Sequence, residues 1–578
     1  MKYTHILSRF LHIHFLEIWL GTLLFVIVCS LVQLAGSKRN LTTALPNQNS
    51  SLLQHISGSL RLDRLPLGMF CIFVCTYIAL ILYQEDFGYY DETLFIFSSL
   101  KGEDFDPPIW IVFGRFWPLG RLEFNFIRIL TQSPEGYHIF PILQLVMLLI
   151  LLFLILKDFS THFRIFVCVL ILTTPTFVVS FFGLVYPERN MLFGLVIFLV
   201  CAKYFYQTKS RYYLCAALVA TQFTLYYKEP VCFLLGGFAL FRIILGINTK
   251  VTQPDTSIVD SPMKQYRLEA GVLLLVAVFI LFYLGIFFPH LNLNYAQLRA
   301  SGTLGTILAY LKFDLLLDIF LLVLFARIYF ALRKSVAWDL FWDPLAIGAL
   351  LYFASFVKLQ LFNIHYMAPV DLVAILYLAR WVVPFFRQKR QRLSALVIAL
   401  TLLVFSRNLA YSAFHVVERK NMIAAKVQVS EFLQQFTKFQ NYSTTTVFFP
   451  FSDSTGYSVM EWAAFLEYKG LKFSTNQTDR NGVQFILKRP FAGQNDDRCI
   501  SYVESIKCFY SSGPEKGDLV VILSDDLIPP DEIKRLEQDA VLLFHYKPFL
   551  AFTNHLLPFF CYESVPDNWL QMLVIRKL

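Results

Sequence analysis

Four carboxylates directly follow an apolar run that ends at Tyr83: Glu85, Asp86, Asp91 and Glu92. A carboxylate just past the end of a membrane-spanning helix lies where the dielectric constant falls steeply but water still reaches. It therefore stays ionised and is a stronger base than in bulk water. This placement predicts a general base that takes a proton from a hydroxyl group, with Asp86 as the first candidate and Glu85 as the second. The alternative is a solvated helix end.

Basic groups that could bind a phosphate occur in two other connections. Arg115 stands among aromatic residues in the run 114–118, and a guanidinium there can hold a phosphate by two parallel hydrogen bonds or anchor the chain by cation–π contact. Lys228 opens an apolar run together with Glu229. Lys228 is predicted either to balance the charge of a leaving phosphate or to pair internally with Glu229 or Glu188.

Two further patterns are less specific. His365 and Tyr366 open a late apolar run, and a lone histidine at a helix start is either a structural hydrogen bonder or a catalytic group. Asp104 and Asp106 have the spacing with which many sugar-nucleotide enzymes hold a metal, but no glycine-rich phosphate loop accompanies them. Metal dependence, on Mg²⁺ or Mn²⁺, is left open by the sequence.

The composition is that of a membrane protein. Hydrophobic residues make up 56% of the 578 residues, charged residues only 16%, and the mean hydropathy is +0.55. No ordinary soluble protein buries so much apolar side chain. The net charge of +9 falls mostly in short connections between apolar runs, so it is a topology signal and does not indicate nucleic-acid binding.

The apolar runs predict a polytopic α-helical membrane protein with about 11–13 transmembrane helices, since a span needs about 20 apolar residues. The predicted runs are 16–36, 66–83, 139–157, 163–183, 191–207, 212–227, 231–247, 269–288, 313–332, 344–358, 367–384 and 394–412.

Lysine and arginine fill every second connection, for example 203–211 and 387–392, which predicts that these connections face the cytoplasm. The alternate connections, which carry all the candidate residues above, then face the opposite side. The predicted organisation is an N-terminal helix and cytoplasmic loop (1–65), a transmembrane domain (66–413) and a C-terminal domain (414–578). The long first external loop, 84–138, mixes aromatic residues with charges, as short helices in the membrane interface do.

The C-terminal part has the composition of a soluble domain. Strand-like runs at 446–451, 483–487, 519–523 and 541–544 alternate with helix-like stretches at 458–468 and 531–539. This alternation predicts an α/β domain on the extracytoplasmic side.

Taken together, these motifs resemble the GT-C fold of glycosyltransferases that use polyprenyl-phosphate sugars, a group that includes protein O-mannosyltransferases and the aminoarabinose transferases of lipid A. The resemblance is carried by the Glu85-Asp86 pair, the amphipathic first external loop, Lys228-Glu229-Pro230, His365-Tyr366-x-x-Pro369 and the external C-terminal domain, and it covers about residues 66–412. The run 114–117 looks more like the bacterial glucosyltransferase branch.

The resemblance implies an enzyme of the bacterial inner membrane. It would transfer a sugar from a polyprenyl-phosphate donor to a hydroxyl of a glycan, glycolipid or protein acceptor on the extracytoplasmic face, with inversion at the anomeric carbon. The family's catalytic carboxylate corresponds to Glu85 or Asp86. Asp91, Arg115, Glu188, Lys228, Glu229, His365 and Tyr366 are the predicted substrate-binding residues. The family has a glycine where this chain has Glu229, so the phosphate role of Lys228 does not follow from that motif alone.

Three other classes fit part of the pattern. A transporter or lipid flippase would also have about a dozen helices, but it would show repeated halves and charges near the midplane. A polysaccharide polymerase or ligase would place its large external portion between helices. A membrane scaffold that binds a partner through its C-terminal domain would not need Glu85 or Asp86.

Overall fold

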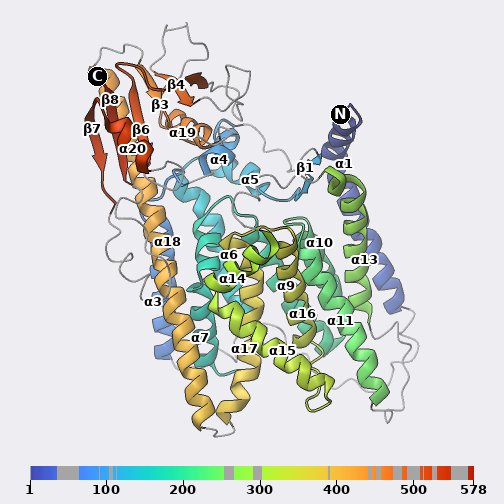
Figure 1. Cartoon of the computed structure of the whole chain (residues 1–578). Helices are drawn as coiled ribbons and strands as arrows, with labels where there is room; N and C mark the ends of the chain where they lie inside the picture. Colours follow the sequence, from blue (N-terminus) through green and yellow to red (C-terminus); the bar gives the residue numbers. More distant parts are fainter. Residues whose placement is uncertain are drawn as a thin grey trace.

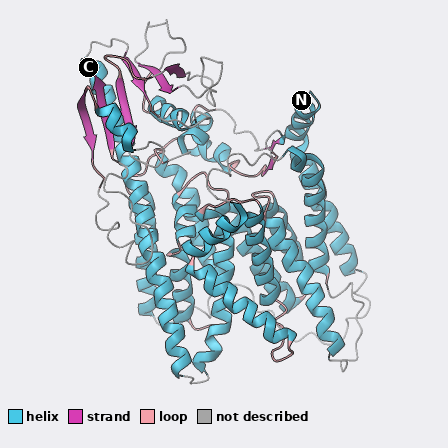
Figure 2. Cartoon of the chain, viewed as in Figure 1, coloured by secondary structure: helices cyan, strands magenta, loops and turns pink. Residues whose placement is uncertain are grey.

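The computed structural model of the chain describes residues 2–35, 64–89, 92–102, 109–111, 114–252, 266–290, 302–387, 391–439, 445–450, 457–472, 485–490, 508–511, 513–523, 530–548 and 571–578. It is mostly helical, with a mixed β-sheet formed by the C-terminal part of the chain (Figures 1 and 2). The predicted fold class is therefore confirmed as a bundle of apolar helices joined to a C-terminal α/β region.

Every predicted apolar run is helical. The helices of the bundle are α1 (Lys2–Ala35), α3 (Arg64–Leu82), α6 (Pro134–Ile155), α7 (Thr161–Leu172), α8 (Pro175–Phe182), α9 (Glu188–Thr208), α10 (Arg211–Leu225), α11 (Val231–Thr252), α13 (Arg267–Phe282), α14 (Gly302–Phe313), α15 (Leu315–Leu332), α16 (Trp342–Lys358), α17 (Ala368–Arg387) and α18 (Gln391–Phe439). Short turns of other helix types follow α13 (Tyr283–Phe287 and Phe288–His290) and precede α17 (Ile364–Met367).

Six of the described helices are long and apolar enough to cross a membrane, or seven if α7 and α8 form one bent span. This is a smaller number than the predicted 11–13. Four of the missing spans are short: α10 and α16 have only 15 and 17 residues, and the apolar stretches of α1 and α11 are shorter than a full span. The fifth is α17, whose last six side chains lie outside the described part of the chain. The chain is a multi-pass integral membrane protein by this measure.

The run 163–183 is the one predicted span that the structure divides. α7 and α8 meet at a bend of 69°. Pro175 begins α8, and its ring disfavours a helical conformation at Thr174, which is extended (ψ 138°). The interruption lets the hydroxyl of Thr176 donate a hydrogen bond of 2.6 Å to Asp371 on α17.

Close packing of α11 on α16 depends on two glycines. A Cβ on Gly348 would collide with the backbone carbonyl of Leu234, and one on Gly237 would lie 3.0 Å from the Cα of Gly348. Backbone atoms cannot move aside as a flexible side chain can. Small residues are what allow such an approach in membrane helices.

We expect Gly348→Ala to destabilise the helical bundle by about 1–3 kcal/mol, since overpacking there must push the two helices apart. Thermal unfolding in detergent measures the change. Gly68→Ala in α3 is the matched control because no atom lies within 4 Å of its added Cβ. Equal unfolding temperatures for the two variants would contradict the proposed close packing.

The loop predicted at 84–138 contains the predicted short helices, α4 (Glu92–Leu100) and α5 (Glu123–Leu130), and a small antiparallel pair, β1 (Ile109–Trp110) with β2 (Arg115–Phe116). In Figure 1, α4 and α5 lie above the helical bundle and below α19, whereas β1 lies farther from the sheet, beside α1. One side of α5 leaves Phe126, Ile129 and Leu130 at least 75% exposed. An uncovered apolar face on an otherwise charged helix is typical of a helix in the membrane interface.

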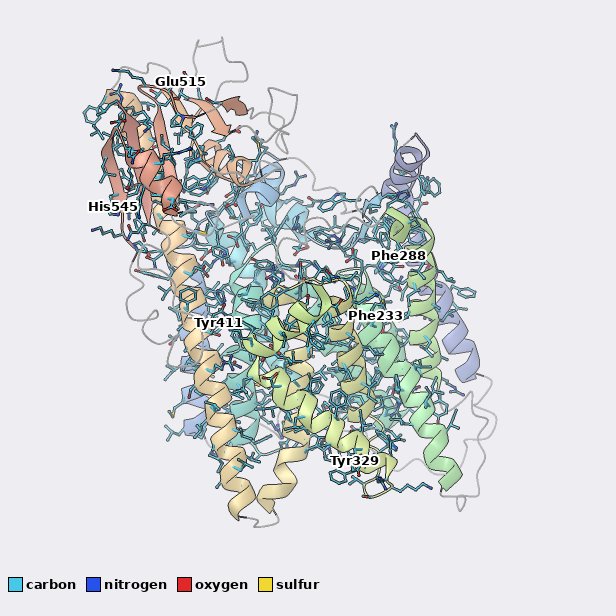
Figure 3. All side chains as sticks on the ribbon, viewed as in Figure 1. Phe233, Phe288, Tyr329, Tyr411, Glu515 and His545 are labelled. Atoms are coloured by element: carbon cyan, nitrogen blue, oxygen red, sulfur yellow. The ribbon has the colours of Figure 1, made fainter. Side chains whose placement is uncertain are left out.

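Exposed aromatic side chains also cover the outside of the bundle. Phe233, Phe288 and Tyr329 are about half exposed and are labelled on different helices in Figure 3, whereas the labelled Glu515 and His545 belong to the sheet region. An apolar outer surface on the helices and polar groups around the sheet match a lipid-embedded bundle with a water-exposed region at one end.

The C-terminal sheet has six strands in the order β5-β4-β3-β6-β8-β7. The strands are β3 (Thr445–Phe448), β4 (Phe485–Pro490), β5 (Cys508–Ser511), β6 (Leu519–Leu523), β7 (Ala540–Tyr546) and β8 (Met572–Lys577), with helices α19 (Tyr457–Tyr468) and α20 (Pro530–Glu537). β5, β4, β3 and β6 are parallel, and β8 is antiparallel to β6 and β7.

α18 joins the two parts of the chain without a break. Its 49 residues span about 73 Å, more than twice the thickness of a bilayer core. The predicted domain boundary at 413/414 lies in the middle of this helix. Met422, Ile423 and Val429 from its second half pack into the same apolar core as the sheet.

Candidate functional site

Residues from four separate segments meet at one end of the bundle, where α9, α11 and α17 begin. We name this group the Lys228 cluster; its members are Arg115, Trp117, Arg121, Glu188, Lys228, Glu229, His365 and Tyr366. Arg115 begins β2, and Trp117 and Arg121 follow that strand. Glu188 is the first residue of α9, Lys228 and Glu229 precede α11, and His365 and Tyr366 lie in the turn before α17. Most of the residues predicted to bind substrate are therefore brought together.

Two ion pairs organise the Lys228 cluster. The Lys228 Nζ lies 2.9 Å from the Glu188 Oε1, and the Arg115 Nε lies 3.1 Å from the Glu229 Oε1. Glu229 also accepts a hydrogen bond of 2.8 Å from the backbone N–H of Phe116. The Glu188 side chain is fully buried and that of Lys228 is 8% exposed.

Aromatic rings enclose these charges. Three cations surround the Trp117 ring, with Arg121, Lys228 and Arg115 at 4.8, 5.9 and 6.0 Å from its centroid. Lys228 also lies 4.6 Å from the centre of the Tyr366 ring. Among the described residues, these three cations face the carboxylates of Glu188 and Glu229, an excess of one positive charge before His365 is counted. The arrangement can attract an anion to a largely water-excluded place.

His365 completes the cluster on the α17 side. Its ring lies 4.3 Å from that of Tyr186 and 4.6 Å from that of Tyr366, and it interacts electrostatically with Glu188. Burial alone would lower the pKa of Lys228, but the Glu188 carboxylate outweighs this and raises that pKa above its usual range. Lys228 therefore keeps its positive charge despite being buried.

The acidic residues after α3 belong to a different group, which we name the Arg419 cluster: Glu85, Glu92, His138, Arg419 and Lys420. Arg419 binds Glu92 through two hydrogen bonds of 2.8 and 2.9 Å and also binds Glu85. Lys420 binds the second oxygen of Glu85, and the His138 Nε2 lies 3.0 Å from the first. These contacts fasten the loop after α3 to the middle of α18.

Glu85 is consequently a weak base. Burial would raise the pKa of its carboxyl group, but Arg419, His138 and Lys420 outweigh burial and hold that pKa below its usual range. Its carboxylate is fully buried and both of its oxygens face cations. The geometry gives Glu85 the properties of a structural anchor.

Asp86 turns towards the C-terminal region. One of its oxygens accepts a hydrogen bond of 2.7 Å from the N–H of Phe87, and the other binds Lys469, which follows α19. Its side chain is 13% exposed. Asp86 thus lies in neither of the two clusters.

The metal prediction can be tested only in part. Asp91, Asp104 and Asp106 lie outside the described residues. Within the described ranges, no group of three or more His, Cys, Asp or Glu side chains is placed to hold a metal ion. The oxygens of Glu85 and Asp86 are already occupied by cations and a backbone N–H, so as arranged these two residues do not fit a divalent ion.

The main residues missed from the sequence are Arg419, Lys420, Lys469, Trp117 and Arg121. Arg419 and Lys420 follow the predicted start of the soluble domain at residue 414. Charged residues are common in soluble domains, so the sequence does not single these two out. Buried carboxylates need cationic partners, so the acidic residues after α3 imply that such partners exist. That rule does not indicate where in the chain the partners lie.

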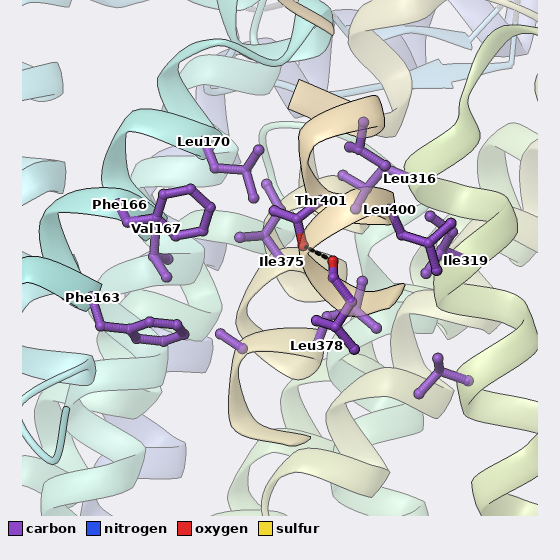
Figure 4. A pocket seen from close by; sticks show the side chains of 14 residues that line it. Phe163, Phe166, Val167, Leu170, Leu316, Ile319, Ile375, Leu378, Leu400 and Thr401 are labelled. Carbon is purple, nitrogen blue, oxygen red and sulfur yellow. Dashed lines mark hydrogen bonds between the residues drawn. The ribbon is translucent and has the colours of Figure 1, made fainter. Parts of the chain in front are cut away.

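Two cavities lie away from both clusters. One of about 170 Å³ opens between α7, α15, α17 and α18; apart from Thr401, its lining is hydrocarbon (Figure 4). The Thr401 hydroxyl is satisfied by the carbonyl of Val397 at 2.8 Å. The other, of about 320 Å³, is polar and lies near the ends of α6 and α9. Neither cavity is lined by a predicted site residue.

Comparison with known proteins gives no relative for this chain. No protein-family model matches it, and no detectably similar protein was found among the curated proteins or the solved structures.

Proposed function

We propose that the protein is a membrane glycosyltransferase that moves a sugar from a polyprenyl-phosphate donor to an acceptor hydroxyl on the extracytoplasmic side. The observation that carries this proposal is the convergence of Arg115, Lys228 and Glu188 at one end of the helical bundle. Buried ion pairs are costly unless their geometry is good, so charges retained there suggest a functional role. A lipid-borne donor would reach such a site from the bilayer.

In this proposal the donor phosphate competes with Glu188 for Lys228. An incoming phosphate has the same charge sign as the carboxylate and can accept hydrogen bonds from Lys228 and Arg115 together. Glu188 then lies in a buried place without its countercharge, which makes its carboxylate a stronger base. The Lys228–Glu188 pair would thus become reactive only when donor is bound.

The Glu188 carboxylate takes the proton from the acceptor hydroxyl, and the oxygen forms a bond to the anomeric carbon. The bond from that carbon to the phosphate oxygen breaks, and the polyprenyl phosphate leaves with the electron pair. Lys228 and Arg115 stabilise the charge that develops on the leaving phosphate, an effect that fixed charges commonly supply at several kcal/mol.

The assay compares membranes that carry wild type, Glu188→Gln, Asp86→Asn or Glu85→Gln, supplied with a radiolabelled polyprenyl-phosphate sugar. We expect Glu188→Gln to lose about 100-fold or more of the transfer rate, because a general base commonly contributes that much. Asp86→Asn should stay within about threefold of wild type. Rates are corrected for the amount of folded protein.

Two results would count against this proposal. Normal transfer by Glu188→Gln together with an inactive Asp86→Asn would move the base to Asp86, as the sequence suggested. A wild-type protein that transfers none of the lipid-linked sugars offered would reject glycosyl transfer and favour the other classes.

One observation favours transport as the second candidate function. The buried carboxyl groups of Asp314, which caps α15, and Asp371 on α17 interact with each other electrostatically, and the described residues supply no hydrogen-bond partner for Asp314 Oδ2 or Asp371 Oδ1. A proton shared between these two oxygens would satisfy both. Proton-sharing carboxyls among membrane helices are typical of proton-coupled transporters. Solute uptake that stops in Asp371→Asn, in the absence of any sugar transfer, would establish this alternative.

A further inference from the structure

The polar cavity of about 320 Å³ lies at the end of the bundle opposite the Lys228 cluster. Glu188 begins α9, whereas Lys203 and Tyr206, which line the cavity, lie in the last two turns of that helix, about 22 Å further along the axis. Arg242 from α11 and Arg380 from the second half of α17 line it as well. Three helices thus contribute a cation each.

The cations around this cavity outnumber the carboxylates. Lys203 pairs with Asp158 at 2.7 Å, Arg242 pairs with Glu269, and Arg380 lies 3.5 Å from Asp339. The described residues add three more cations within electrostatic reach: Lys157, Lys209 and Arg164. Six cations minus three carboxylates leave a charge of about +3, an excess that favours an anionic group such as a phosphate.

Most of these charges are held in place before any ligand arrives. Lys203 also donates a hydrogen bond of 2.7 Å to the carbonyl of Ile155, and the guanidinium of Arg242 lies 3.6 Å from the centre of the Tyr206 ring. Because these side chains are already held in place, little conformational entropy is lost when an anion binds to them.

Arg380 is the cation least committed to its carboxylate. Its distance of 3.5 Å from Asp339 exceeds the 2.7–2.9 Å or so of a strong charge-assisted pair, and its side chain is 47% exposed. Asp339 accepts hydrogen bonds of 3.0 and 3.1 Å from the N–H groups of Phe341 and Trp342. Arg380 can therefore bind a ligand while the Asp339 carboxylate keeps its two hydrogen bonds from backbone N–H groups.

We propose that this cavity binds a phosphate group, and that the phosphate is carried by the headgroup of an anionic phospholipid. The cavity lies at helix ends, and its connections predict that this end faces the cytoplasm, whose leaflet is rich in anionic lipids. The aromatic rings of Tyr206, Phe341 and Trp342 on its wall suit the boundary between headgroup and hydrocarbon. The site is independent of glycosyl transfer.

The test is thermal unfolding of the full-length protein in detergent, titrated separately with short-chain phosphatidic acid, phosphatidylcholine and inorganic phosphate. We expect phosphatidic acid to raise the unfolding temperature in a saturable way, and phosphatidylcholine to do so much less. Arg380→Gln should weaken the apparent affinity about five- to tenfold, and Arg380→Glu should abolish saturation.

Arg333→Gln is the matched control, because Arg333 is an exposed cation at the C-terminal end of α15 that does not line the cavity. It should bind phosphatidic acid as wild type does. Saturation by inorganic phosphate alone, lost in Arg380→Glu, would support the phosphate site and assign it a soluble ligand. Equal titrations for Arg380→Glu and Arg333→Gln, or no stabilisation by any phosphate compound, would overturn the proposal.

Discussion

Arg419→Met is expected to lower the free energy of unfolding by about 3–5 kcal/mol, because it leaves the carboxylates of Glu85 and Glu92 buried without their shared cation. Those two side chains are almost completely enclosed, so water cannot replace the guanidinium. Thermal unfolding of the purified protein in detergent measures the loss. We also expect the loop between α3 and α4 to become more sensitive to proteolysis.

The control variant is Lys438→Met, which removes an exposed cation near the end of the same helix. It should change the stability by less than about 0.5 kcal/mol. The triple variant Arg419→Met, Glu85→Gln, Glu92→Gln should recover part of the loss, since no uncompensated charge remains. An unfolding temperature for Arg419→Met equal to that of wild type would show that the Arg419 cluster does not hold the loop to α18.

The same cluster sets the direction of the pH dependence. The pKa of Glu85 is held below its usual range, so its contribution to stability is fully present above the unfolded value of about 4.3. This contribution is lost as the pH falls through the lower pKa of the folded state.

The second large effect concerns activity. Lys228→Met should reduce glycosyl transfer by about 100-fold or more, because it removes the cation that we propose to bind the leaving phosphate, and it leaves Glu188 buried and unpaired. The rate is measured with the labelled lipid donor at saturating acceptor, and normalised to folded protein.

Two further variants separate catalysis from folding. Lys228→Met combined with Glu188→Gln removes both charges of the pair, so it should fold better than Lys228→Met alone while remaining inactive. Lys358→Met removes an exposed lysine at the end of α16, which leads towards the same turn, and should transfer normally. If the double variant recovers both stability and transfer, the Lys228–Glu188 pair is structural.

Much of the helical architecture follows from the sequence, because apolar periodicity and composition report directly on lipid-facing helices. The runs from 66–83 to 394–412 are all helical, and β3, β4, β6 and β7 lie where short apolar runs predict strands. β5 and β8 were missed. β8 pairs with β6 and β7, and a strand specified by such distant pairing leaves only a short apolar signal in the chain.

The candidate site was only partly predictable. Glu188, Lys228 and His365 could be grouped because each opens or precedes an apolar run, and Arg115 because its loop is predicted to lie on the same side of the membrane. Glu85 could not be separated from them by this rule, since its partner Arg419 lies 334 residues away and no local pattern links the two. Which carboxylate meets which cation depends on how the helices pack.

The uninterrupted course of α18 has a mechanical consequence. A helix without a hinge cannot absorb a tilt between the C-terminal sheet and the bundle, because bending it would break its backbone hydrogen bonds. A partner that displaced the sheet would tilt the whole of α18. Because Arg419 on this helix binds Glu85 and Glu92, the loop after α3 would move with it. The sheet region is thus mechanically linked to the membrane surface over which an acceptor would approach.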